Sequence, residues 1–149
     1  MNTAPKSGDV DALNQLLRGE LSAVETYDQA IEKFDGKHGA SELKTIRDEH
    51  SRAVRTIKEQ VAKFGGEPSS SSGIWGTFVT TVTGTAKVMG PETVLAALKK
   101  GEEHGIGEYE KAIANSSVNH ESKELFRSEF LPRCRQHIAK LDDLVGSKV

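Results

Sequence analysis

The sequence has one cysteine, no apolar leader and no apolar run of membrane-spanning length, and each absence excludes a class of protein. Cys134 has no partner for an internal disulfide. Residues 1–10 lack the apolar core of a signal peptide. The longest apolar stretch, residues 74–82, is rich in threonine and falls well short of the roughly 20 residues that a membrane helix needs. We therefore expect a cytoplasmic protein without a membrane partner.

An excess of charge of one sign is also missing. The formal net charge is -2, and acidic and basic residues are interspersed along the 149 residues. No basic face therefore marks a surface for nucleic acid or anionic lipid. A hydrophobic content of 36% is enough for one continuous core but not for two. We expect a flexible tail at residues 1–8, a single domain over residues 9–146, and no nucleic-acid partner.

Apolar residues recur at spacings of three and four in four segments, which is the pattern of helices with one buried face. The first helix is predicted over residues 9–34 and ends at a short turn with two glycines, so the second, residues 41–64, returns antiparallel. The third begins at Pro91, which suits the first turn of a helix. The fourth begins near residues 119–122, and Pro132 is expected to kink its middle.

Residues 65–90 separate the second and third helices. They begin with a Gly/Pro/Ser linker and continue into the β-branched stretch at residues 74–82. A lone strand has no pairing partner in a helical chain, so we assign the segment to a crossover. Roughly 11 extended residues span a bundle of about 35 Å, so the crossover is long enough to make the second and third helices parallel. We predict an all-α four-helix bundle with this long crossover.

One polar residue interrupts the apolar stripe of each predicted helix: Glu20, His50, Glu102 and His137. Carboxylates and imidazoles ligate zinc and iron, so all four are candidate metal ligands. A rise of about 1.5 Å per residue places His50 opposite residues 24–27, and Glu20 about two turns lower. The crossover would then bring together His50, Glu102 and His137. A short-loop arrangement would instead group Glu20, Glu102 and His137.

The third helix also contains three glycines. Gly101, Gly105 and Gly107 each cost roughly 1 kcal/mol in helix propensity relative to alanine. Close helix approach, or room for a bulky neighbour, would explain them. The spacing Gly101-x-x-x-Gly105 lies within a predicted helix, so it is not a phosphate-binding loop.

Several short motifs resemble those of known ferritin-like proteins. LNQLLRGELSA at residues 13–23 resembles the start of the first helix of bacterioferritin, in which the matching glutamate, Glu20 here, ligates iron. Over roughly residues 10–145 the chain resembles a bacterial ferritin-like domain family of unknown function. That resemblance is carried by GGEP at 65–68, SGIWG at 72–76 and LKKGEEHG at 98–105. It implies a ferritin-like four-helix bundle and, by analogy, a stress-related role through oligomerisation, but no established activity.

The sequence departs from the di-iron pattern of that superfamily. Ferritins and rubrerythrins carry Glu-x-x-His on two helices, because residues three apart project side by side. Here Arg47 and Cys134 stand three residues before His50 and His137, so both bridging carboxylates are missing. One iron or zinc ion held by two imidazoles and a carboxylate still fits the ligand types. The alternative is a structural layer in which neighbouring tyrosines and glutamates satisfy the histidines.

Three functions fit these observations. The first is a ferritin-like bundle that is not an enzyme and whose polar layer is structural. The second is an iron- or zinc-binding bundle with oxidase or storage activity, in which oxygen-dependent Fe²⁺ oxidation is lost in His50→Ala. The third is a homo-oligomeric interaction module, most simply a dimer, that uses the apolar surface around Trp75 and Phe78.

Overall fold

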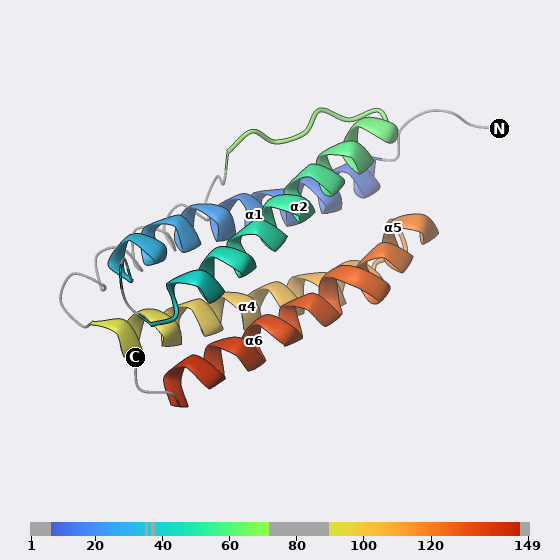
Figure 1. Ribbon diagram of the computed structural model, residues 1–149. Coiled ribbons are helices and arrows are strands. Elements are labelled where there is room, and N and C mark those ends of the chain that lie inside the picture. The colour runs from blue at the N-terminus through green and yellow to red at the C-terminus, as the bar shows by residue number, and fades with distance from the viewer. Residues whose placement is uncertain (1–6, 35, 37, 72–89, 147–149) are drawn as a thin grey trace.

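The protein folds into a bundle of four long helical segments (Figure 1). The computed structural model describes residues 7–34, 36, 38–71 and 90–146. The first three helices are α1 (Ser7–Lys33), α2 (Ala40–Lys63) and α4 (Pro91–Ala114). The fourth segment is continuous and consists of α5 (His120–Leu125), η2 (Phe126–Phe130) and α6 (Leu131–Gly146). The described part contains no strand, and the predicted all-α four-helix bundle is confirmed.

The helices form two antiparallel pairs, α1 with α2 and α4 with α6 (Figure 1). The helices α2 and α4 run in the same direction, so the end of α2 and the start of α4 lie at opposite ends of the bundle. This is the direction that a long crossover requires. Residues 72–89, including the Trp75 segment, lie outside the described residues. The domain limits and the Trp75 surface stay predictions.

The second helix ends in a hydrogen-bonded cap. Phe64 is its last half-helical residue, and Gly65 follows with a φ of 83°. The Gly66 N–H donates to the Val61 carbonyl at 2.9 Å, and the Gly65 N–H donates to the Ala62 carbonyl at 3.0 Å. This pair of bonds is a Schellman motif, and it needs the left-handed conformation that glycine adopts without a Cβ clash. The predicted end of the helix at residue 64 is therefore explained by Gly65.

The fourth helical segment contains a wide turn just before Pro132. Phe126–Phe130 is π-helical, and the Leu131 N–H donates to the Phe126 carbonyl, five residues earlier. Proline has no N–H, so Pro132 cannot donate to the carbonyl four residues before it. A π turn is one of the irregularities that accommodate such an interruption. The structure thus has a π turn on the N-terminal side of Pro132, and the kink expected at this proline stays a prediction.

The apolar core consists of two clusters at the two ends of the bundle. One is built around residues such as Leu13, Leu17, Ile57 and Phe126, and the other around Phe34, Leu43, Leu95 and Leu141. The polar residues that interrupt the helix stripes lie between the two clusters, at mid-height of the bundle. Charged groups at that depth lose their hydration, so they require partners within the protein.

Candidate metal centre

Each of the four helical segments contributes one buried polar residue to the centre of the bundle. The four residues predicted as metal ligands are all 6% exposed or less: Glu20 on α1, His50 on α2, Glu102 on α4 and His137 on α6. Each occupies the position of an apolar residue on the buried face of its helix, so the helix period directs its side chain to the common axis. The structure thus places all four where the sequence pattern predicted them, in the core.

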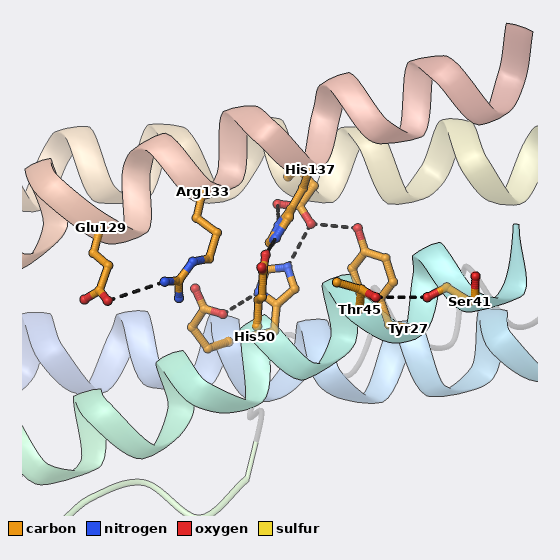
Figure 2. Close-up of polar contacts among 10 residues, drawn as sticks. Tyr27, Ser41, Thr45, His50, Glu129, Arg133 and His137 are labelled. Atoms are coloured by element: carbon orange, nitrogen blue, oxygen red, sulfur yellow. Dashed lines mark hydrogen bonds and ion pairs between the residues drawn. The ribbon is translucent and has the colours of Figure 1, made fainter.

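The carboxylate of Glu102 joins the two imidazoles. His50 Nε2 lies 2.8 Å from Glu102 Oε2, and His137 Nδ1 lies 3.2 Å from Glu102 Oε1. The two imidazole rings are tilted against each other with centroids 4.8 Å apart. Figure 2 shows His50 and His137 converging from opposite helices toward this shared group. One carboxylate and two imidazole nitrogens therefore face a common point.

Glu20 belongs to the same network, which corrects the expected register. Its Oε1 lies 2.6 Å from His50 Nδ1, although the rise along the helices was expected to separate the two residues. That expectation counted only positions along the helix axis. Side-chain reach along the axis covers only about one helical turn, so the observed contact also means that Glu20 and His50 are closer to level than the predicted two turns. All four predicted residues, and not three of them, are connected.

Glu49 is a member of the cluster that the sequence pattern missed. Its Oε1 lies 2.7 Å from His137 Nε2, the ring nitrogen that does not face Glu102. Glu49 precedes His50 directly, so it lies off the apolar stripe of α2, and its side chain is 38% exposed. Helical periodicity selects fully buried positions and cannot find such a residue. An acidic residue directly beside a core histidine was the only sequence signal for it.

Two tyrosines complete the hydrogen bonding of the buried carboxylates. The Tyr27 hydroxyl donates to Glu102 Oε2 at 2.7 Å, and the Tyr109 hydroxyl donates to Glu20 Oε2 at 2.5 Å. Burial, together with the neighbouring carboxylates, raises the pKa of both phenols well above the usual value. Both hydroxyls therefore keep their protons and remain donors.

The ionised state of this cluster is set by competition between burial and the neighbouring charges. Burial lowers the pKa of His50, but the carboxylates of Glu102 and Glu20 outweigh it and raise the pKa well above its usual value. Burial likewise raises the pKa of Glu102, but His50 and His137 outweigh it and hold that pKa well below its usual range. Without a metal, the centre therefore holds a buried His50 imidazolium against the ionised carboxylate of Glu102.

Cys134 and Arg133 lie beside the cluster. Burial and the nearby carboxylates of Glu102 and Glu20 strongly raise the pKa of the Cys134 thiol, so it is protonated and a poor nucleophile. Arg133 Nη2 lies 3.4 Å from Glu129, and Nη1 is buried without a hydrogen-bond partner among the described residues. Arg133 lines a small hollow together with Glu20, Glu49 and His137, so its positive charge lies near two carboxylates. Figure 2 shows its guanidinium between Glu129, which it contacts, and the two histidines.

The geometry allows a metal ion at the point where the imidazoles meet Glu102. His50, Glu102 and His137 each offer one ligand atom, and these atoms lie within 4.8 Å of one another. Ligand atoms at about 2.0–2.2 Å from a tetrahedral zinc ion lie about 3.3–3.6 Å apart. Rotation of the side chains would therefore have to bring the most distant atoms closer by about 1.3 Å. The cluster could hold a metal ion.

Comparison with known families is consistent with an uncharacterised role. A family model described as a domain of unknown function, DUF2383, matches residues 9–115. The chain belongs to the DUF2383 family. The matched region contains Glu20, Glu49, His50 and Glu102, whereas His137 lies beyond it. No curated protein and no solved structure matches the chain. Among the described residues, no helix of this DUF2383 protein is long and apolar enough to cross a membrane.

The raised pKa of His50 predicts how the stability of the metal-free protein depends on pH. The folded state keeps the His50 proton above the ordinary imidazole pKa of about 6.5, at which the unfolded chain releases it. The stabilisation is therefore complete below about pH 6.5 and is lost as pH rises through the folded pKa. The free energy of unfolding, measured with urea in a chelator, should fall by up to about 1.4 kcal/mol per pH unit over this window.

His50→Gln should flatten this slope, because the group that titrates differently in the two states is gone. His38→Gln provides the matched control, since His38 is exposed, and it should retain the slope of the wild-type protein. An unchanged slope in His50→Gln would contradict the assignment of the buried proton to His50.

Proposed function

We propose that this DUF2383 protein binds one divalent transition-metal ion at the centre of its bundle. The ligands are His50 Nε2, His137 Nδ1 and a carboxylate oxygen of Glu102. The single observation that carries the proposal is that both imidazoles present one nitrogen to the same buried carboxylate, at 2.8 and 3.2 Å. Two imidazoles and a carboxylate, with further positions open, are a ligand set of zinc enzymes and of non-haem iron sites.

The second nitrogen of each imidazole supports the same proposal. His50 Nδ1 contacts Glu20, and His137 Nε2 contacts Glu49, at 2.6 and 2.7 Å. Metal-binding histidines commonly donate their other ring N–H to a carboxylate, which fixes the tautomer and orients the ring. Glu20 and Glu49 would hold these roles here. In this assignment Glu20, the position that resembles an iron ligand of bacterioferritin, orients a ligand and does not bind the ion itself.

Charge balance favours a bound cation. Both nitrogens of each imidazole face carboxylate oxygens, so several carboxylates converge on the two rings. In the metal-free protein the proton held by His50 offsets part of this negative charge. A cation bound at His50 Nε2 would displace the proton there and take over this role, so it would not be an uncompensated charge in the core.

A ferritin-like identity is the finer form of this proposal. Two observations support it. The helices α2 and α4 run in the same direction, and each helical segment carries one buried residue of a type that binds metals. The missing Glu-x-x-His pairs favour one ion over two, because Arg47 is turned to Asp28 and Asp48 and cannot bridge metals. Bound iron would supply reactivity toward oxygen or peroxide, and bound zinc would not. A stress-related role remains part of the proposal by family analogy. A cytoplasmic location and a dimer through the Trp75 segment remain part of it as expectations from the sequence.

A structural polar layer is the competing function. It is favoured by a different observation, namely that each ring nitrogen and each phenol of the cluster already has a carboxylate partner. Such a layer would fix the register of the helices without any ion. The two functions differ in one measurable respect, which is whether the folded protein retains a metal.

Metal retention should distinguish them. After anaerobic loading with Fe²⁺ or Zn²⁺ and desalting, the wild-type protein should keep one equivalent by plasma mass spectrometry. His50→Ala/His137→Ala should keep none, because two of three ligands are gone. His38→Ala/His120→Ala removes two exposed imidazoles and should behave like the wild-type protein. Equal retention by both double variants would place the metal elsewhere. No retention by the wild-type protein would favour the structural polar layer over metal binding.

The carboxylate of Glu49 provides a second prediction. Glu49→Gln removes the carboxylate partner of His137 but leaves all three proposed ligands in place. Loss of such a partner typically weakens metal affinity about 10- to 100-fold. Competition with a coloured chelator should therefore show unchanged stoichiometry and a weaker affinity. Glu59→Gln, an exposed acid on the same helix, should leave the affinity unaltered. Identical affinities for the wild-type protein and Glu49→Gln would contradict the assigned role of Glu49.

A further inference from the structure

A cavity of about 50 Å³ lies between α1 and α4, on one side of the polar cluster. Its walls are mostly apolar or small residues from the two helices, among them Leu16, Gly19, Ala23, Leu98 and Gly105. Its inner end is formed by the cluster itself, including Tyr27, Tyr109, Glu20 and Glu102. The cavity therefore lies directly beside the polar cluster at the centre of the bundle.

Gly105 keeps this space open at the expense of helix stability. A Cβ at Gly105 would meet nothing nearer than Cys134 Sγ at 4.0 Å, so tight packing does not require glycine there. The residue lies within α4 and has no need of a left-handed backbone. Alanine would be favoured by roughly 1 kcal/mol. Close helix approach, one of the two explanations expected from the sequence, is therefore wrong for Gly105. The other, room for a bulky neighbour, does not apply either, because among the described residues only Cys134 Sγ lies near this position.

A second hollow adjoins the cavity. This wider hollow, of about 410 Å³, is lined by residues such as Asp11, Lys111 and Asn115, and it shares Gln15, Leu16 and Glu108 with the cavity. Between the two, Gln15 Nε2 donates to Glu108 Oε1 at 2.8 Å, which links α1 to α4. A hydrogen bond between two surface side chains opens readily compared with a packed core, and its opening would connect the two spaces.

The size and charge of the lining restrict what the cavity can hold. At about 10–15 Å³ per water molecule, it has room for about three to five waters, or for one molecule with about that many non-hydrogen atoms. The carboxylates of Glu20 and Glu102 at the inner end repel anions. The apolar walls penalise a cation that has lost its hydration. A neutral molecule that is apolar over most of its surface meets neither penalty.

We infer that the space between α1 and α4 is a binding site for a small, neutral, largely apolar molecule, placed directly beside the buried His/Glu cluster. This site goes beyond metal binding and does not depend on it, because its walls are formed by the protein alone. Its occupant would contact the phenols and carboxylates at the inner end without displacing them.

Xenon is a suitable probe, because it is neutral, apolar and small enough for cavities of this kind. Methyl ¹H–¹³C spectra of the metal-free, full-length protein under increasing xenon pressure should show saturable shifts at Leu16 and Leu98, which line the cavity. Val61, buried in the core but not among the lining residues, should stay unchanged. Gly105→Leu fills the space and should abolish the saturable shifts. Gly107→Leu is the matched control, since a Cβ at Gly107 meets nothing, and should retain them.

The same spectra can overturn the inference. Shifts that rise linearly with pressure, or that are identical in Gly105→Leu and the wild-type protein, would show that no specific site exists. Strong transfer of magnetisation from water to the Leu98 methyls, unaffected by xenon, would show a cavity filled with water only. If Gly105→Leu does not fold, Gly105→Ala, which projects a methyl group into the same space, should weaken the xenon shifts relative to Gly107→Ala. Unweakened shifts would likewise contradict the inference.

Discussion

The rest of the structure depends on the hydrogen bonds to one buried carboxylate, that of Glu102. It is 4% exposed and accepts hydrogen bonds from Tyr27, His50 and His137, which come from the three other helical segments. A charge buried without partners costs on the order of several kcal/mol. The four helical segments therefore gain most when they are packed in the one register that brings these donors together. Sliding any segment by one turn, about 5.4 Å, would leave charge unpaired in the core.

Much of the fold could be predicted from the sequence, because helical periodicity directly indicates which face of a helix is buried. It placed the helices, the end of α2 to within one residue, and the four polar residues on the apolar stripes of their helices. The hydrogen-bond network among those residues could be predicted only in part. Glu20 was separated from His50 because position along the axis was counted without side-chain reach, and Glu49 was missed because it lies off the buried stripe. The π turn at Phe126–Phe130 has no periodic signal beyond the proline that follows it.

The bundle gives up stability in two places near the same point. Charged side chains replace apolar ones in the middle of the core, and Gly105 keeps a cavity that a larger side chain would fill. Natural sequences tend to depart from stable packing where a function requires it. The proposed binding of one divalent ion by the cluster, beside a space for a small neutral molecule, would account for both departures. The metal and the cavity would then act on a common centre, although each can be tested without the other.

X-ray absorption spectroscopy at the metal edge of the loaded protein tests the central claim most directly, because it observes the ligands of the ion itself. For zinc, the account predicts a first shell of nitrogen and oxygen at about 2.0–2.1 Å, with the outer-shell scattering of imidazole. Iron should likewise show imidazole scattering. In His50→Ala/His137→Ala the imidazole contribution should disappear. A spectrum of the wild-type protein with oxygen ligands alone, or with sulfur at about 2.3 Å, would contradict the account.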